Sequence, residues 1–359
     1  MNKWLVFIAL LVAYFFGAPV AVEPKYWQAP VNAGFVGDFQ SNNKLSQLNY
    51  IDIGSSTGPE DVVSDNLGRL YVSTHQGEIL RTNADGKFEP WVISLGRPLG
   101  MAIYKQHLYV ADAYQGLVQV DLHSKLIRLL TDQVNSRPIN YANNLDISDE
   151  GIIYFSDAST KFGAKQFGGT YEASLLDLLE HGQHGRILQY DLNSGITSVL
   201  IAELNFANGV ALSHDQSSLY IAETGGYQVY KYHLKGNNKG KLEPFISNLP
   251  GFPDNLTRGL DGRYWLGLAS PRNELLDLLS QWPILRKMLQ RLPEFIRPKA
   301  VHYGHVMAFD DQGRITSLQD PLGHYGVNTG AYETINRIYI ASLTADKLAY
   351  IDKQNVPFD

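Results

Sequence analysis

The feature that most constrains this chain is a unit that recurs six times along it. Each copy is an apolar, alternating strand, a short turn containing Asp or Gly, and a second strand rich in aromatic and aliphatic residues. The copies begin at Glu60, Leu99, Asn143, Asn208, Asp254 and Thr329. Repeats of this kind are typical of folds in which each unit buries its hydrophobic face against the next one.

A second pair of strands follows each copy, for example in residues 185–197 and 304–315. Four strands in each of six units predict an all-β protein, a six-bladed β-propeller. The sixth unit is one strand short, because the chain ends soon after residues 347–352, and residues 43–50 have the pattern of a fourth strand. We therefore expect an N-terminal strand to complete the last blade, which removes exposed sheet edges. A two-layer β-sandwich is the alternative, but it explains neither the count of six nor the displaced strand.

Two segments depart from the strand pattern. Residues 171–180 are predicted to form a helix inside the third blade, and residues 273–295 a longer helical insertion in the fifth, interrupted at Pro283. Apolar residues recur at helical spacing in the longer segment. Three interpretations of it remain open: an ornament on the rim of the propeller, a lid over the mouth of an active site, or a helix that lies on a membrane surface.

The N-terminal residues 1–22 have the pattern of a targeting or anchoring segment. Lys3 precedes an uncharged stretch from residue 4 to residue 22, with small residues at Gly17 and Ala18. This pattern predicts either a secretory signal peptide or a membrane anchor. Because no Ala-x-Ala cleavage site follows, we favour a retained anchor. Residues 23–359 are then expected to form a single propeller domain outside the cytoplasm: periplasmic, secreted or lumenal.

Composition narrows the class of function. The chain is 44% hydrophobic and 18% charged, which excludes a disordered or fibrous protein. Its net charge of −6 argues against a nucleic-acid partner. The chain has no cysteine, so disulfides, thiolate metal sites and cysteine nucleophiles are excluded. We expect a small molecule as substrate and the membrane as a partner of the N-terminal segment; the oligomeric state stays open.

The first residues of the six units are expected to meet, because the innermost strands of a propeller converge on its axis. Four of the six are oxygen donors. Two carboxylates and two amide carbonyls suit Ca²⁺ or another hard divalent cation, and the absence of His and Cys from this set of residues disfavours zinc or copper. We therefore predict a metal site formed by Glu60, Asn143, Asn208 and Asp254. The alternative is a water-filled axial channel lined by polar strand ends.

Several motifs carry a family resemblance. They are Gly58–Asp61, Arg97–Met101, Asn143–Ile147, Ala207–Leu212 and Pro250–Leu256. With them, the chain after residue 30 resembles the strictosidine synthase-like family in its adipocyte plasma membrane-associated protein branch. This family is grouped with the gluconolactonase, senescence-marker-protein and paraoxonase-like six-bladed propellers. The resemblance implies a central Ca²⁺ held by a Glu, two Asn and an Asp, which fall on the same four residues.

The resemblance also implies a reaction. Related propellers hydrolyse lactones, aryl esters or organophosphates, and in several of them the Asp ligand is the proposed base or nucleophile, so Asp254 is the predicted catalytic residue. The synthases themselves use a catalytic Glu in the last blade, at a position that aligns near Thr329. We predict a Ca²⁺-dependent hydrolase of lactones or aryl esters, with Asp254 or a metal-bound water supplying the nucleophile. The alternatives are a condensing enzyme, as in the synthases, and a propeller that binds without catalysis.

Overall fold

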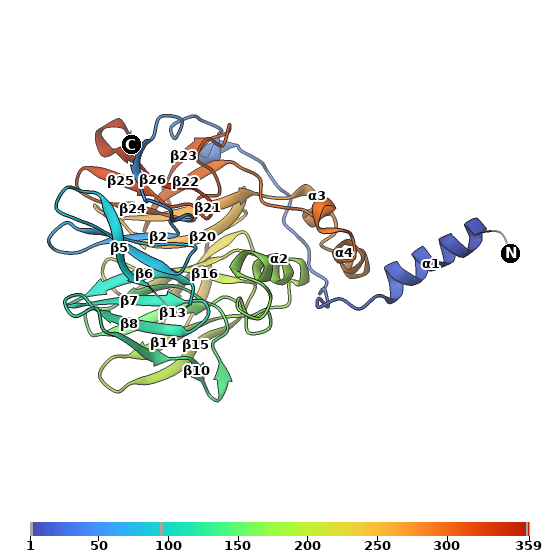
Figure 1. Ribbon diagram of the computed structural model, residues 1–359, viewed down its shortest axis with the longest axis horizontal. Coiled ribbons are helices and arrows are strands. Elements are labelled where there is room, and N and C mark those ends of the chain that lie inside the picture. Colours follow the sequence, from blue (N-terminus) through green and yellow to red (C-terminus); the bar gives the residue numbers. More distant parts are fainter. Residues whose placement is uncertain (1–2, 94–95, 357, 359) are drawn as a thin grey trace.

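The computed structural model describes residues 3–93, 96–356 and 358, and their strands form six four-stranded antiparallel sheets arranged in a ring, with one small additional hairpin (Figure 1). The innermost strand of each sheet contacts the innermost strands of its two neighbours, in the order β2, β6, β12, β16, β20, β24 and back to β2. The ring is therefore closed, and the predicted six-bladed β-propeller is confirmed.

Each blade runs from its innermost to its outermost strand in chain order. Blade 1 is β2 (Asp61–Ser64), β3 (Leu70–Ser73), β4 (Glu78–Thr82) and β5 (Phe88–Ile93). Blade 2 is β6 (Pro98–Tyr104), β7 (His107–Asp112), β8 (Gly116–Asp121) and β9 (Ile127–Thr131). Blade 3 is β12 (Ala142–Ile147), β13 (Ile152–Asp157), β14 (Gly185–Asp191) and β15 (Ile196–Leu204), preceded by a small hairpin of β10 (Gln133–Val134) and β11 (Arg137–Pro138).

The second half of the ring repeats this plan. Blade 4 is β16 (Ala207–Leu212), β17 (Ser218–Glu223), β18 (Gln228–His233) and β19 (Leu242–Ile246). Blade 5 is β20 (Gly251–Arg258), β21 (Arg263–Pro271), β22 (Gly304–Asp310) and β23 (Ile315–Asp320). Blade 6 is β24 (Ala331–Glu333), β25 (Arg337–Ile340), β26 (Lys347–Asp352) and, as its outermost strand, β1 (Asn49–Asp52).

The N-terminal strand closes blade 6 as expected, but the predicted position of that strand was wrong. Strand β1 pairs with β26 through Asn49–Asp52, whereas residues 43–48 form turns. The side chain of Leu45 is buried, and its amide donates to the carbonyl of Gln319 in blade 5 at 2.9 Å. Leu45 and Leu48 are therefore apolar because they pack against blades 5 and 6, and they do not mark a strand.

Both predicted helical insertions are confirmed. Helix α2 (Thr170–Glu180) lies between β13 and β14 of blade 3. Between β21 and β22 of blade 5 the chain forms α3 (Glu274–Leu278), α4 (Pro283–Gln290) and the 3-10 turn η2 (Glu294–Ile296). We call residues 273–300 the blade-5 insertion. It lies beside α2 on one side of the ring (Figure 1), with Pro283 at the start of α4, where a missing N–H is tolerated.

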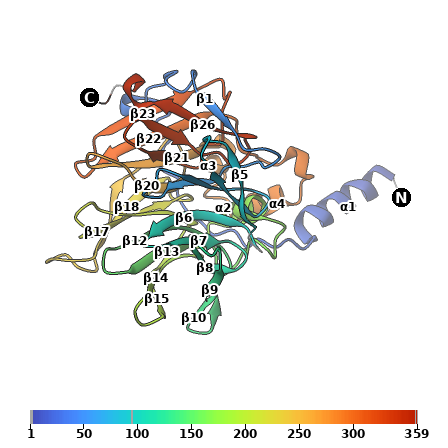
Figure 2. The ribbon, with the colours of Figure 1, turned by 60° about the vertical axis from the view of Figure 1, so that its left-hand side comes forward.

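Helix α1 (Lys3–Gly17) precedes the propeller and points away from the ring in both ribbon views (Figures 1 and 2). Among the described residues, no helix has the length and apolar character needed to cross a membrane. Residues 1–2 of the predicted anchor or signal segment lie outside the described residues. Two further 3-10 turns, η1 (Gly37–Phe39) and η3 (Lys353–Asn355), lie near the ends of the ring-forming chain.

The core is a series of apolar layers between neighbouring blades. Between blades 4 and 5, the rings of Tyr220 and Tyr264 lie 4.7 Å apart, and Phe309 stacks on Tyr264 at 5.3 Å. Closer to the axis, side chains bond to the backbone of the next blade: the carboxylate of Asp61 accepts the amide of Met101 at 2.7 Å, and the side-chain oxygen of Asn144 accepts that of Val210 at 2.8 Å. These bonds fix the rotation of each inner strand relative to the next.

Candidate metal centre and the pocket above it

A β-bulge lies where four of the inner strands reach the axis. The strand register shifts between Pro98 and Met101, between Ala142 and Leu145, between Ala207 and Val210, and between Pro253 and Leu256. The predicted axial residues of blades 2 to 5 lie inside these four shifts. Because a bulge turns a side chain out of the normal alternation, it directs these residues toward the axis.

The inner strands approach one another closely at the bulges. A Cβ atom on Gly209 would overlap the backbone nitrogen of Leu256 in the next blade, and one on Gly100 would overlap the Cα of Asn144. Only glycine fits at both places. The glycine after Asn208 is therefore required for blades 4 and 5 to come within reach of one another.

The four predicted metal ligands face one cavity. Glu60, Asn143, Asn208 and Asp254 all line a pocket of about 370 Å³ at the end of the axis where the inner strands begin. Glu60, Asn143 and Asn208 are buried, and Asp254 is partly open to the cavity. The structure thus brings the four side chains to one place.

Two of these side chains present an oxygen without a partner. Among the described residues, the buried Oδ1 atoms of Asn143 and Asn208 accept no hydrogen bond. A buried carbonyl oxygen without a donor loses about 1–3 kcal/mol relative to one that is paired. Two such oxygens beside two carboxylates form a donor set that fits a hard cation such as Ca²⁺. No group of three or more His, Asp and Glu that could hold an ion occurs in the described part of the chain, and this set, half of it amide, is of another kind.

Neighbouring side chains fix the orientation of these donors. The Nδ2 of Asn208 donates to the hydroxyl of Thr224 at 3.2 Å, and that hydroxyl donates to the carbonyl of Pro253 at 2.7 Å. Since the amide nitrogen is occupied by Thr224, the amide oxygen of Asn208 is left for the cavity. The backbone of Glu60 is held in a similar way, because its carbonyl accepts Thr329 Oγ1 at 2.7 Å and Asn255 Nδ2 at 3.1 Å.

A buried arginine accompanies the two carboxylates. Arg97 Nη2 lies 3.0 Å from Oε2 of Glu60, and both side chains are almost completely buried. The same guanidinium donates through Nη1 to the carbonyl of Thr74 at 2.7 Å. Arg97 therefore offsets the charge of Glu60. No basic side chain among the described residues offsets the charge of Asp254 in the same way.

Burial and mutual repulsion control the protonation of the two acids. Burial raises the pKa of Asp254 well above its usual range, the negative charge of Glu60 raises it further, and the amide of Asn208 partly offsets the rise. Burial also raises the pKa of Glu60, although Arg97 opposes it. Two buried carboxylates that repel one another are stabilised by a cation placed between them.

The other two axial positions have different surroundings. Leu99 lines the cavity and adds an apolar wall. Thr329 is completely buried, and its hydroxyl is used by the carbonyl of Glu60. A neutral threonine therefore stands where the synthases are expected to carry a catalytic Glu.

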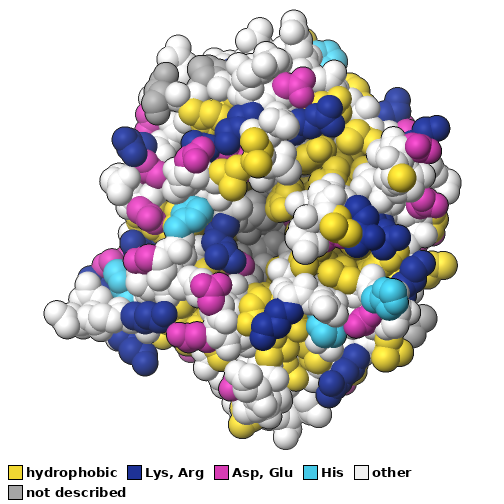
Figure 3. Space-filling model, turned by 90° about the vertical axis from the view of Figure 1, so that its left-hand side faces the viewer, with side chains coloured by type: hydrophobic (Ala, Val, Ile, Leu, Met, Phe, Trp, Pro, Cys, Tyr) yellow, Lys and Arg dark blue, Asp and Glu magenta, His cyan; other side chains and the backbone are white. Residues whose placement is uncertain are grey.

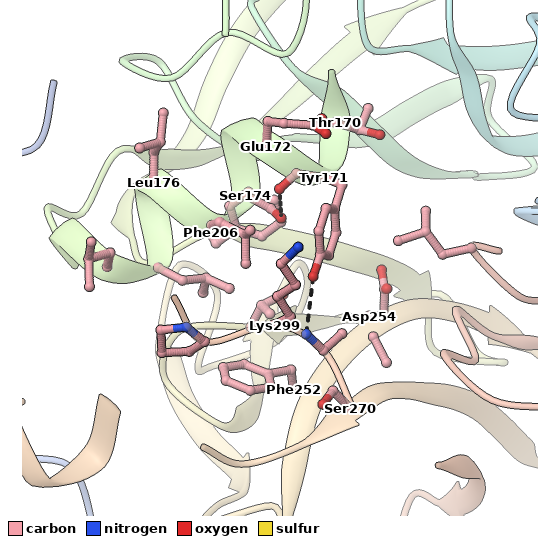
Figure 4. Close-up of a pocket in the computed structure, with 18 of the residues that line it drawn as sticks. Thr170, Tyr171, Glu172, Ser174, Leu176, Phe206, Phe252, Asp254, Ser270 and Lys299 are labelled. Carbon is pink, nitrogen blue, oxygen red and sulfur yellow. Dashed lines mark hydrogen bonds between the residues drawn. The ribbon is translucent and has the colours of Figure 1, made fainter. Parts of the chain in front are cut away.

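The walls of the pocket are mostly apolar and come from the inner ends of the blades and from the two helical insertions. Leu99, Phe167, Leu176, Phe206, Phe252 and Leu289 are among the residues that line it. The hydroxyl of Tyr171 on α2 accepts the backbone amide of Ala300 at 3.1 Å, so that α2 and the blade-5 insertion are joined across the pocket (Figure 4). Figure 4 also shows Lys299 and Asp254 around the same space. The insertion therefore covers the axial site, which favours a lid over a rim ornament.

Sequence patterns alone missed three residues of this site. Arg97, Thr224 and Asn255 each contact a predicted ligand residue, and Asn255 also has a buried Oδ1 without a partner. Asn255 directly follows Asp254 in the bulge of blade 5, so a bulge signature would have indicated it. Arg97 directly precedes β6, and Thr224 directly follows β17. Neither stands at the repeat position that the predicted ligands share, so the repeat does not indicate them.

Comparisons with known proteins place the chain. Residues 143–237 match the model of the strictosidine synthase family, and residues 37–82 match that of the N-terminal part of strictosidine synthase-like proteins. Strictosidine synthase-like protein 6 of Arabidopsis thaliana is 31% identical over 333 residues, which cover 87% of this chain and 84% of that protein. The adipocyte plasma membrane-associated protein of Bos taurus is 30% identical over 358 residues, covering 92% of this chain and 84% of that protein.

Solved structures share the fold at low sequence identity. A gluconolactonase of Xanthomonas campestris superposes with a TM-score of 0.62 and 16% identity, over 93% of this chain and 95% of that one. A calcium-binding regucalcin of Agrobacterium tumefaciens gives 0.59 and 15%, over 85% and 94%. At this level of identity the similarity establishes the propeller architecture and no more.

Proposed function

This chain belongs to the strictosidine synthase-like family, and from that premise we propose that it is a Ca²⁺-dependent hydrolase of lactones or aryl esters. Family membership alone does not decide the reaction, because one fold supports many activities. The observation that carries the proposal is the pair of unpartnered amide oxygens, on Asn143 and Asn208, beside Glu60 and Asp254 at the floor of an apolar pocket.

Glu60, Asn143, Asn208 and Asp254 are the proposed ligands of the cation. A divalent cation bound there polarises an ester or lactone carbonyl and stabilises the negative charge that develops on its oxygen. Four protein oxygens are fewer than the six to eight that Ca²⁺ takes, so room for a substrate oxygen remains. Arg97 lies 3.0 Å from Glu60 and favours its ionised form against the effect of burial.

Asp254 is the proposed catalytic residue. It is the ligand side chain with exposure to the cavity, and burial together with Glu60 raises its pKa. A carboxylate that faces the cavity can take a proton from an attacking water or attack the acyl carbon itself. The apolar walls exclude bulk water and hold an aryl or alkyl group of the substrate.

A metal-independent condensation, as carried out by synthases, is the second candidate. The names of the relatives support it. The chemistry of blade 6 argues against it, because Thr329 is neutral and its hydroxyl is already bonded to the carbonyl of Glu60. A third candidate is a binding module in which the cation only stiffens the axis.

We also propose that the propeller functions outside the cytoplasm and that the N-terminal segment is retained as a membrane contact. The side chains of α1 are apolar along its length and none is buried. Relatives include proteins named for their association with the adipocyte plasma membrane.

A chelator experiment separates these candidates. Purified protein is stripped of metal and assayed against a panel of aryl esters and lactones, with and without added Ca²⁺. A hydrolase predicts turnover that requires Ca²⁺ and is abolished in Asp254→Asn, while the matched control Asp149→Asn, on an exposed turn, keeps full activity. A condensing enzyme predicts product in the presence of chelator. A silent panel combined with a Ca²⁺-dependent rise in melting temperature supports the binding module.

A further inference from the structure

The blade-5 insertion carries an unusual concentration of exposed apolar side chains. Large hydrophobic residues on it are strongly exposed: Leu278 (71%), Trp282 (60%), Ile284 (66%), Phe295 (81%) and Ile296 (54%). Exposed hydrophobic residues that occur singly are normal, but a group of them on one short segment marks an interaction surface. The insertion therefore has one face that lines the pocket and another, exposed and apolar, that can bind a partner.

Helix α1 identifies the chemistry of that partner. Its residues from Trp4 to Phe16 include nine large hydrophobic side chains that are exposed, and none of its side chains is buried. A helix that is apolar on all sides is compatible with the interior of a protein or with lipid, and unfavourable in water. The absence of a polar stripe leaves lipid as the environment that suits α1.

The end of α1 is attached directly to the insertion. Arg291, just after α4, donates from Nε to the carbonyl of Ala18 at 2.6 Å and from Nη1 to the carbonyl of Phe15 at 2.7 Å. The hydroxyl of Tyr14 donates to the carbonyl of Arg291 at 2.7 Å. Because α1 leaves the protein at α4, a bilayer that receives α1 must lie against the insertion.

The chain beyond α1 is held to the same segment. Arg286 donates to the carbonyls of Lys25, Leu179 and Ser280, and Trp27 stacks on His181 at the end of α2 with ring centroids 3.9 Å apart. These contacts attach residues 14–27 to α2 and to the blade-5 insertion, so that α1 is not a helix on a free linker.

The position of the pocket agrees with a lipid partner, whereas charge is neutral to it. Residues 274–299 contain five basic and three acidic side chains, but Arg286 and Arg291 are buried, so the other three basic side chains only match the acidic ones in number. Glu294 and Arg297 line the pocket and enclose the exposed Phe295 and Ile296 between them. The face turned away from α1 differs from the insertion, because basic and acidic side chains are interspersed there among the hydrophobic ones (Figure 3).

We propose that the blade-5 insertion is a lipid-docking surface: α1 and the exposed residues of α3, α4 and η2 engage the same bilayer, and the mouth of the pocket opens at the lipid–water interface. The docking does not depend on the proposed hydrolase activity. The consequence for substrate delivery does depend on that activity: an apolar ester or lactone dissolved in the bilayer reaches the pocket without passing through water.

Tryptophan quenching tests the contact of the insertion separately from that of α1. The chain has five tryptophans, of which Trp91 and Trp265 are buried and Trp27 is stacked on His181. In full-length Trp4→Phe protein, Trp282 is the strongly exposed one. Vesicles of phosphatidylcholine and phosphatidylglycerol with brominated acyl chains are expected to quench its emission, and the quenching is expected to disappear in Trp4→Phe/Trp282→Phe.

Vesicle binding of a charged variant gives an independent readout. Phe295→Glu/Ile296→Glu is expected to lower partitioning into these vesicles by about tenfold or more, because two apolar contacts with lipid are replaced by charge. The matched control is Leu67→Glu/Ile335→Glu, two equally exposed residues in the turns that join first and second strands, at the other end of the inner strands. Melting temperatures of all variants verify that they fold.

Two results overturn the proposal. One is protein that binds vesicles while Trp282 stays unquenched and the Phe295/Ile296 variant binds like its control, which leaves α1 as the whole lipid contact. The other is no vesicle binding by the intact chain. Supply is tested separately: the same variant should slow hydrolysis of a long-chain ester held in vesicles and leave a short soluble aryl ester unaffected. If neither ester is hydrolysed, the proposed function fails and the docking result stands.

Discussion

Replacing Thr224 by valine should weaken metal binding without removing any ligand. The hydroxyl of Thr224 accepts the amide of Asn208 at 3.2 Å and donates to the carbonyl of Pro253 at 2.7 Å. Valine keeps the shape of the side chain but loses both hydrogen bonds. The amide of Asn208 is then free to rotate, so its oxygen is no longer held toward the cavity.

Both magnitudes follow from these contacts. The carbonyl of Pro253 loses its donor, which lowers the free energy of unfolding by about 1–3 kcal/mol. Loss of a residue that orients a ligand lowers metal affinity by about 10- to 100-fold. Titration calorimetry of metal-free protein with Ca²⁺ measures the affinity, and urea unfolding measures the stability.

Thr170→Val is the matched control. Thr170 also lines the pocket, but its buried hydroxyl has no hydrogen-bond partner among the described residues, so its removal should leave the Ca²⁺ affinity unchanged. An affinity of Thr224→Val within about twofold of wild type would refute the view that this hydroxyl holds Asn208 in position.

Three further predictions concern other parts of the structure. Arg97→Met leaves the buried carboxyl of Glu60 without its partner, so the metal-free protein should lose about 3–5 kcal/mol in free energy of unfolding by urea. Added Ca²⁺ should narrow the difference from wild type, and an equal difference with and without Ca²⁺ would contradict the site. Arg286→Met removes the donor to the carbonyls of Lys25, Leu179 and Ser280, so limited proteolysis within residues 18–30 should become faster. The control is Lys287→Met, which removes an exposed ion pair with Glu23. Equal rates of cleavage in the two variants would contradict the attachment of residues 18–30 to the insertion. Burial lowers the pKa of His305 to about 3, below its unfolded value of about 6.5, so between these pH values only the unfolded state binds the proton. The free energy of unfolding therefore falls as the pH drops through this range, by up to about 1.4 kcal/mol per pH unit. His305→Gln should flatten this pH dependence in urea titrations, and an unchanged dependence would exclude His305 as its source.

The repeat made the architecture predictable because every blade uses the same strand pattern. Alternation of apolar residues, turn residues and the count of six were visible in the sequence, and so was the helical spacing of α2 and the blade-5 insertion. The closing strand was predicted too early in the chain because Leu45 and Leu48 are apolar for another reason: they pack against blades 5 and 6 from outside any strand. An apolar pattern indicates which side chains are buried and does not indicate what buries them.

The candidate ligands could be found because each stands at the same position of its repeat. Glu60, Asn143, Asn208 and Asp254 line one pocket, as the register predicted. Arg97 could not be found in this way, because its guanidinium crosses from blade 2 to Glu60 of blade 1, a contact that depends on how closely the inner strands approach. The composition of the pocket walls was equally out of reach, since α2 and the insertion come together only in the folded ring.

Calcium titration of metal-free protein is the most direct test of the axial site. The structure predicts one Ca²⁺ per chain, with binding abolished in Asp254→Asn and lowered sharply in both Asn143→Leu and Asn208→Leu, each of which removes an amide oxygen that lacks a protein partner. If the protein binds no Ca²⁺, or if both leucine variants bind it as tightly as wild type, then the four side chains do not form a metal centre.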